Sequence, residues 1–413
     1  MTKLKALLCG SAACFAAAFS AEAADLPVKA KSVDYVKVCS AHGEGFYYIP
    51  GSDTCLKIGG EVRAEYAFVD GNALDDYQIG FHSRAYVEAD ARNATEYGTL
   101  RAFARLQITV QSGAYVDAYS EETEIELDRA FIQYLGLTAG RTQSFWDFTE
   151  NTNWGTLRFS DGHVVNLLAY THTFGDGFSA TLSLEDPTSR HSFDTWIGLD
   201  HDDRLDVPDV VAVLDLEREW GTLHLAAVAH ENQQFVLEWD RTGNMIYHSE
   251  WGWAIGFGAR VNVDAVAEGD YLWLNAGYSR GALPYLLDDN GIRPNLFVHT
   301  DTNRLTSIEL MKGWQVSGGI VHNWTPTLKT SLFGSYAEVD PFMFHPTIPA
   351  FYKYREYRVG LQNVWAPADG FEMGFEVLYV DIDNRLIAGM NPRPENDADG
   401  NLWEVRLRMV RQY

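Results

Sequence analysis

The feature that most constrains the fold of this chain is an alternation of apolar and polar residues with a period of two. It is plain in the last segment, NLWEVRLRMVRQY, where Trp403, Val405 and Leu407 alternate with polar or charged residues. Period two is typical of a β-strand with one apolar and one polar face. Chain ends fray unless a sheet holds them, so we expect this strand to pair within a sheet.

Sixteen segments of this kind follow one another. They begin near residues 56, 79, 100, 123, 137, 164, 177, 209, 222, 253, 270, 313, 328, 355, 371 and 401. Short connections, such as 93–97 and 175–176, alternate with long ones, such as 143–163 and 232–252. An up-and-down transmembrane barrel has this asymmetry, with periplasmic turns and longer extracellular loops. An even number of strands then places both termini on the periplasmic side.

A barrel in a membrane explains these segments better than a soluble β-sandwich does. Strands of about 9–11 residues suffice to cross a bilayer when they are tilted. Many aromatic residues lie near segment ends, where a barrel carries its aromatic girdles: Tyr97, Phe174, Phe178, Trp220, Trp251, Trp253, Trp324, Trp365 and Phe371. The polar parity carries many charges, which suits a water-filled lumen, and sixteen strands enclose one. The sequence predicts an all-β, 16-stranded antiparallel transmembrane β-barrel over residues 56–413.

The first 23 residues predict export. Two lysines precede an apolar run from Ala6 to Phe19, and the tripeptide Ala-Glu-Ala ends at Ala23. These are the parts of a secretory signal peptide, residues 1–23. An N-terminal membrane anchor fits less well, because the apolar run is too short to cross a bilayer.

Residues 24–55 form a predicted periplasmic segment with the two cysteines left after cleavage, Cys39 and Cys55. An exported chain meets an oxidising compartment, so we predict a disulfide between them. Two thiolate metal ligands are the alternative, but the chain lacks the further cysteines of such sites.

Charge and motifs argue against several classes of function. The formal charge of −25 argues against a nucleic-acid partner. GYSRG, at Gly277–Gly281, has the spelling of a nucleophile elbow, but no helix is expected after it. NDADGN resembles part of a calcium loop, yet Arg406 stands where the acidic ligand belongs. We therefore predict no enzyme and no metal or other cofactor.

Two stretches carry a resemblance to a known family. ADLPVKAKSVDYVKVCSAHGEGFYYIPGSDTCLKIGGEVRAEY, at Ala24–Tyr66, resembles the N-terminal signature of the alphaproteobacterial (type-2) porins of the outer membrane, and AGRTQSFWDF, at Ala139–Phe148, is similar to their entry into an inward-folded third loop. The final Tyr413 resembles the terminal aromatic that outer-membrane assembly machinery recognises, although the general pattern favours Phe there and an aromatic or apolar residue at the position of Arg411. The resemblance implies a homotrimer of sixteen-stranded barrels.

The predicted functional site is a constriction of the pore. We expect loop 143–163 to fold inward and to present Asp147 and Glu150 as its acidic side. A basic wall of four arginines on the polar parity of the first three strands is expected opposite: Arg63, Arg84, Arg101 and Arg105. Charged rings of this kind tune ion preference. The alternative is that each arginine merely pairs with a neighbouring carboxylate: Glu61, Glu65, Glu88 or Asp90.

Two loop-entry residues, Arg141 and Ser144, fit a hinge as well as they fit the pore lining. The leading function is passive diffusion of ions and small hydrophilic solutes through an outer-membrane porin in contact with lipid and lipopolysaccharide. A substrate-specific channel for a sugar or an anion is the second hypothesis. An outer-membrane enzyme or adhesin and a soluble secreted β-protein complete the alternatives.

Overall fold

The computed structural model describes residues 37–71, 78–116, 120–148, 154, 163–190, 207–239, 245–287, 296–301, 304–345, 348–387 and 400–413. The predicted signal peptide, residues 1–23, and the predicted pore residue Glu150 lie outside these described residues. No helix of the described part is long and apolar enough to cross a membrane.

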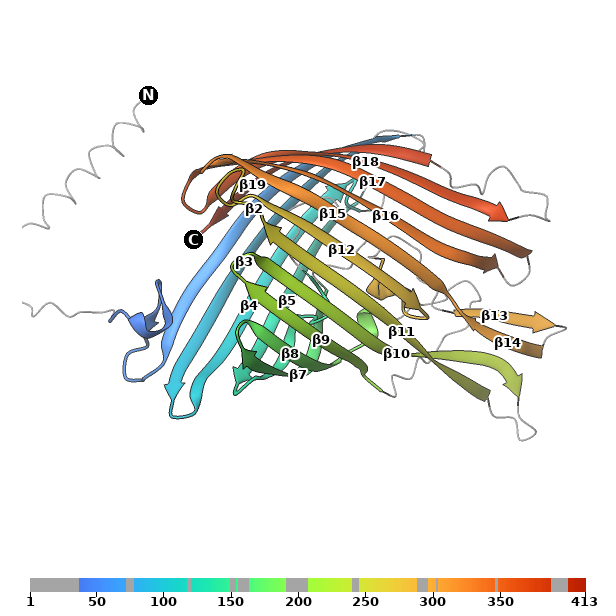
Figure 1. Ribbon diagram of the computed structural model, residues 1–413, viewed down its shortest axis with the longest axis horizontal. Coiled ribbons are helices and arrows are strands. Elements are labelled where there is room, and N and C mark those ends of the chain that lie inside the picture. Colours follow the sequence, from blue (N-terminus) through green and yellow to red (C-terminus); the bar gives the residue numbers. More distant parts are fainter. Residues whose placement is uncertain are drawn as a thin grey trace, which may run out of the picture.

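Sixteen antiparallel strands close into one barrel (Figure 1). They are β2 Cys55–Gly71, β3 Gln78–Thr95, β4 Gly98–Gly113, β5 Glu121–Tyr134, β6 Leu137–Gln143, β7 Val164–Gly175, β8 Phe178–Glu185, β9 Asp209–Arg218, β10 Gly221–Trp239, β11 Met245–Asn262, β12 Tyr271–Arg280, β15 Lys312–Thr325, β16 Leu328–His345, β17 Ile348–Ala368, β18 Phe371–Ile387 and β19 Gly400–Gln412. The final strand pairs with the first, from Leu402 opposite Gly71 to Gln412 opposite Glu61. The prediction of a 16-stranded antiparallel barrel is confirmed.

Two of the connections expected to be long loops contain paired strand instead. β10 continues to Trp239 and pairs with β11 from Met245 onward, and β16 and β17 pair as far as His345 opposite Ile348. Strand alternation weakens in these stretches, so the sequence pattern ended the strands too early. The connection between β12 and β15 holds further structure, with a 3₁₀ turn η4 (Leu283–Tyr285) and the hairpin β13 (Leu296–Asp301) and β14 (Arg304–Leu310).

The apolar parity of the strands faces outward and is exposed. Val62, Leu106 and Ile125 are 53%, 52% and 67% exposed, although each is flanked along its strand by polar residues that face the interior. Eight of the nine predicted girdle aromatics are exposed, with Tyr97, Trp220 and Trp324 beside short turns, whereas Phe371 is half-buried. An apolar exterior around a polar interior is the reverse of a soluble sandwich and is typical of a transmembrane barrel.

Both described ends of the chain lie at the same end of the barrel (Figure 1). The predicted disulfide between Cys39 and Cys55 is present, next to the short strand β1 (Tyr47–Tyr48) that pairs with the start of β2. Tyr413 exchanges two backbone hydrogen bonds of 3.1 Å with Gly60. The last residue is thus held by the first barrel strand, as expected for a closing strand.

Candidate functional site

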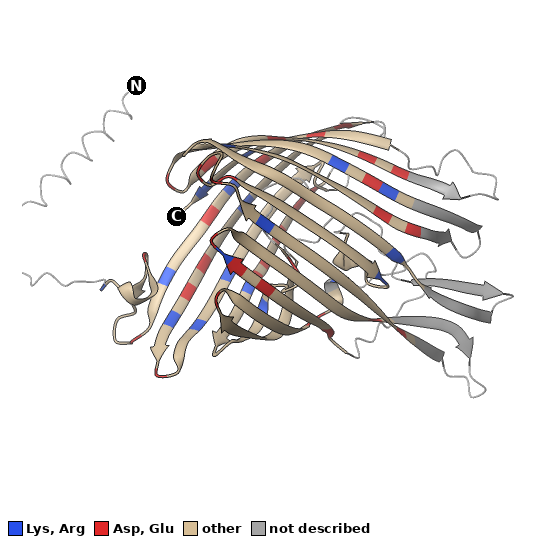
Figure 2. Ribbon diagram, in the orientation of Figure 1, with Lys and Arg blue, Asp and Glu red and all other residues tan. Residues whose placement is uncertain are grey.

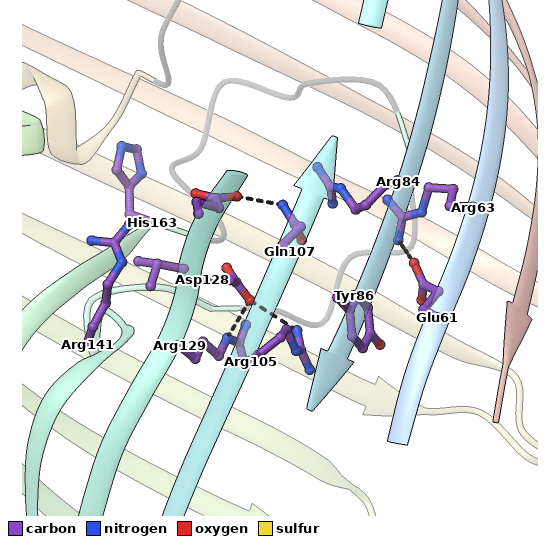
Figure 3. Close-up of a pocket in the computed structure, with 12 residues that line it drawn as sticks. Glu61, Arg63, Arg84, Tyr86, Arg105, Gln107, Asp128, Arg129, Arg141 and His163 are labelled. Atoms are coloured by element: carbon purple, nitrogen blue, oxygen red, sulfur yellow. Dashed lines mark hydrogen bonds and ion pairs between the residues drawn. The ribbon is translucent and has the colours of Figure 1, made fainter. Parts of the chain in front are cut away.

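A polar cavity of about 490 Å³ lies inside the barrel against the strands β2 to β5 (Figure 3). Its lining holds five arginines and three carboxylates, together with Tyr86, Gln107, His163 and Val164. The arginines are Arg63, Arg84, Arg105, Arg129 and Arg141, and the carboxylates are Glu61, Glu126 and Asp128. Figure 2 shows acidic and basic residues together along β2 and β3, whereas the charged residues of β4, on the same side of the barrel, are all basic.

Three of the four arginines predicted as a basic wall line this cavity, namely Arg63, Arg84 and Arg105. Arg101 does not belong to the lining. Its guanidinium donates to both carboxylate oxygens of Asp90, at 3.1 and 3.0 Å, and to Gln133 at 3.0 Å. It also lies over the rings of Phe103 and Phe131, so packing and pairing account for its position.

The lining has features both of the predicted basic wall and of the alternative, in which each arginine pairs with a neighbouring carboxylate. Most of its arginines are paired. Arg63 lies 2.9 Å from Glu61, and Arg105 contacts Glu88 at 2.6 Å. Arg84 makes no hydrogen bond or ion pair with any described residue, and its Nε is buried without a partner. The wall therefore contains both paired guanidiniums and one that faces the cavity without an ion pair, although Glu61, Glu126 and Asp128 attract it from a greater distance.

A β-bulge in β5 brings in two charged residues that sequence reasoning missed. Arg105 on β4 pairs with Arg129, but the next residue, Leu106, pairs with Leu127, so Asp128 is an extra residue in the strand. The bulge turns Asp128 and Arg129 toward the cavity together. The sequence held a signal for it, because the apolar parity changes from Leu127 to Ala130 and Ile132.

The residues after β6 pack against the inner face of β9 to β11. Trp146 is fully buried among a cluster that includes Val211, Val228 and Ala254, and its indole N–H donates to the carbonyl of Tyr285 at 2.7 Å. Phe148 covers Gly258 so closely that an added Cβ would lie 2.4 Å from its ring. A glycine at this position therefore makes room for the aromatic ring.

A buried ionic network ties the same residues to two other connections. Arg190, in the 3₁₀ turn η2 (Thr188–Arg190) after β8, donates to Glu185 at 3.0 Å and lies 4.0 Å from Asp147. Ser144 donates to the same Glu185 at 2.6 Å. The Arg190 guanidinium also stacks over the ring of Tyr285, in η4, at 4.1 Å.

Burial alone lowers the pKa of Arg190, but the fields of Tyr285, Asp147 and Glu185 outweigh it and raise the pKa above its ordinary value. The guanidinium therefore stays charged although it is enclosed. Asp147 faces this network and does not belong to the cavity lining, with a fully buried side chain. Of the two predicted loop-entry residues, Ser144 belongs to the network, whereas Arg141 lines the cavity and donates to the carbonyl of Leu127 at 3.0 Å.

Trp154 makes a second set of contacts, on β18 and β19. Its backbone N–H donates to Glu376 at 2.5 Å, and its carbonyl accepts from Arg406 at 2.6 Å. Its ring lies 4.6 Å from the guanidinium of Arg408, and an added Cβ at Gly374 would lie 2.9 Å from the ring. Sequence spacing could not have indicated these partners, because more than two hundred residues separate Trp154 from each polar one.

Comparison with known proteins identifies the family of this chain. The family model described as "Porin subfamily" matches residues 25–401. The chain belongs to this porin subfamily. The porin Omp2b of Brucella abortus is 32% identical over 310 residues, which cover 68% of this chain and 75% of that protein. Omp2b of Brucella suis is 31% identical over 319 residues, with the same coverage of each chain. The predicted membership of the alphaproteobacterial porins is confirmed.

Solved structures show the same fold at low identity. The outer membrane channel DcaP of Acinetobacter baumannii has a TM-score of 0.62 and 15% identity, over 89% of this chain and 99% of that chain. An anion-selective porin from Comamonas acidovorans has a TM-score of 0.51 and 13% identity, over 87% of this chain and all of that one, 100%. With its family, its relatives and its closed barrel, this porin is an outer-membrane channel protein.

Proposed function

We propose that this porin passes ions and small hydrophilic solutes passively through a water-filled lumen, which the segment between β6 and β7 narrows as an inward-folded third loop. The observation that carries the proposal is the pair of contacts at Trp146 and Trp154. Trp146 packs on the inner face of β10 and β11, and Trp154 binds β18 and β19. Four strands, β12, β15, β16 and β17, separate these two walls. A segment anchored on both walls reaches across the lumen.

The arginine-lined cavity faces the space that this loop would narrow. Its five arginines exceed its three carboxylates, so the lining carries a net positive charge although the whole chain carries −25. Charge close to a constriction outweighs distant charge in setting ion preference, because screening removes fields beyond about 10 Å at 0.1 M salt. The channel therefore favours anions over cations.

We further propose that both termini lie in the periplasm and that three copies assemble around one axis. The short connections β3–β4 and β5–β6 lie at the same barrel end as Tyr413, which suits the periplasmic turns of outer-membrane barrels. The exposed aromatic side chains near the turns suit the interface of a lipid bilayer, and lipopolysaccharide would then contact the loop end. The terminal strand, closed by Tyr413, would carry the signal for the assembly machinery.

Uptake of uncharged sugars of graded size into proteoliposomes tests this function. A passive, narrowed channel admits small sugars at rates that fall steeply with size and do not depend on stereochemistry. Saturable uptake of one stereoisomer would instead favour a sugar-specific channel. Tyr86 is the one aromatic residue among the twelve lining residues of the described cavity, and an aromatic ladder for sugars needs a longer run.

A further inference from the structure

Three pairs of arginines stand directly opposite one another on neighbouring strands of the lumen wall. Arg92 faces Arg101 across β3 and β4, Arg105 faces Arg129 across β4 and β5, and Arg63 faces Arg84 across β2 and β3. Like charges directly opposite in a sheet are destabilising. Each pair therefore needs a compensating negative charge or a functional reason for being there.

In two of the pairs, a carboxylate of the protein lies between the guanidiniums. Asp90 accepts from Arg92 at 2.7 Å and from Arg101 at 3.0 Å. Asp128, the extra residue of the β5 bulge, lies 3.3 Å from Arg105 and 3.7 Å from Arg129. A single carboxylate thus bridges two opposed arginines in each case.

The third pair has no such bridge among the described residues. Glu61 contacts Arg63 at 2.9 Å but makes no ion pair with Arg84, and the Nε atoms of both arginines are buried without a hydrogen-bond acceptor. Glu61, Glu126 and Asp128 attract Arg84 from a greater distance, but none of them lies between the two guanidiniums as an ion-pair partner of both. Both side chains line the cavity in the lumen, from the neighbouring strands β2 and β3 (Figure 3). The pair that lacks a bridging acid is therefore one that a solute in the lumen can reach.

We propose that Arg63 and Arg84 form an oxyanion-binding site, where a carboxylate or phosphate group of a solute takes the place that Asp90 and Asp128 take between the other two pairs. The two guanidiniums present planar forks of N–H donors, which match the paired oxygens of such groups. Chloride is a single spherical ion without paired oxygens, so it cannot accept two parallel N–H bonds from one guanidinium in this way. This inference rests on the proposed channel and names the class of solute that binds within it, namely small metabolites that carry an oxyanion.

Single-channel recording in planar bilayers tests the site, with inorganic phosphate as the first probe and acetate as the second. Phosphate added to a potassium chloride solution is expected to reduce the current in a saturable way. Arg84→Gln should raise the half-blocking phosphate concentration at least about tenfold, since it removes a charge-assisted bond to the anion. Arg101→Gln is the matched control, because it removes one arginine from a pair that Asp90 already bridges, outside the cavity lining.

A phosphate effect lost in Arg84→Gln and kept in Arg101→Gln supports the site. Equal weakening in both variants would show a diffuse positive field and would overturn it, as would the absence of any saturable effect on the wild-type channel. If Arg84→Gln fails to fold, Arg63→Gln provides the same comparison. Acetate distinguishes carboxylate recognition from recognition of phosphate alone. Wild-type protein that inserts but never conducts would refute the proposed channel itself, a different outcome from a conducting channel that ignores phosphate.

Discussion

Arg190→Met removes the charge that holds the segment after β6 to the inner wall. The side chains of Arg190, Glu185 and Asp147 are all fully buried. Methionine is similar to arginine in length and fills much of the same space, so the change is mainly one of charge. Glu185 and Asp147 are then left near each other as buried carboxylates without the guanidinium.

Breaking a buried ion pair on one side costs about 3–5 kcal/mol, because the remaining charge stays out of water. Glu185 keeps its bonds from the Ser144 hydroxyl and the Phe145 amide, so we expect the lower value, about 3 kcal/mol. This loss lowers the free energy of local opening of the segment after β6, because the contacts of that segment depend on Glu185. A loss of about 3 kcal/mol corresponds to opening roughly 10²-fold more often.

Native-state hydrogen exchange measures this opening directly. The Phe145 amide, which donates to Glu185 at 3.0 Å, should exchange about 10²-fold faster in Arg190→Met. The amide of Thr171, in β7, donates at 2.9 Å to the carbonyl of Gly136 in the turn between β5 and β6; it is the control and should not change. The double variant Arg190→Met/Glu185→Gln should recover part of the protection, because a neutral amide replaces the unpaired charge.

An acceleration of less than about fivefold would refute the reasoning, since that is the effect of an exposed ion pair. Equal acceleration at Thr171 would mean that the whole barrel had been destabilised. Either result would contradict the conclusion that the ion pairs of Arg190 hold the segment after β6 to the turn η2 locally.

Three further predictions concern other parts of the fold. Reduction of the Cys39–Cys55 disulfide, which closes a loop with a sequence separation of 16, should destabilise the N-terminal segment by about 3 kcal/mol; protease susceptibility of that segment should rise while channel conductance stays the same. Deletion of Tyr413 removes both backbone bonds to Gly60 and should slow conversion to the heat-modifiable barrel on gels; unchanged assembly kinetics would contradict a role in closure. Gly258→Val should displace Phe148, because an added Cβ lies 2.4 Å from its ring, and should alter conductance, whereas Ile125→Val, at an exposed position on the outer face of β5, should not.

Strand number and closure could be predicted because the barrel exterior imposes period two on every strand. Exposed apolar residues such as Val62 and Leu106 alternate with polar neighbours along the strands. Each strand can therefore be recognised from its own stretch of sequence. The exceptions also have local causes. The bulge at Asp128 shifts the parity within β5, and the last residues of β10 and β16 lose the alternation although they remain paired with β11 and β17.

The site could be predicted only in outline. Residue parity placed Arg63, Arg84 and Arg105 on the cavity side, but it gave Arg101 the same role, since parity says nothing of depth along the barrel. The partners of the segment after β6 lie far away in sequence: the carbonyl that Trp146 bonds belongs to Tyr285, 139 residues on. Such contacts depend on how connections fold over one another, and no periodic pattern records that.

The most direct test of the central claim is the single-channel conductance of the wild-type porin beside that of a variant without residues 145–162. The Ser144 amide donates to the carbonyl of His163 at 2.8 Å, so a two-residue Asn-Gly turn can join the two ends without moving β6 or β7. A lumen narrowed by this segment predicts a clearly larger conductance in the variant, with larger sugars admitted to proteoliposomes. Equal conductance and an equal size limit, in a variant that still forms a heat-modifiable barrel, would contradict the account.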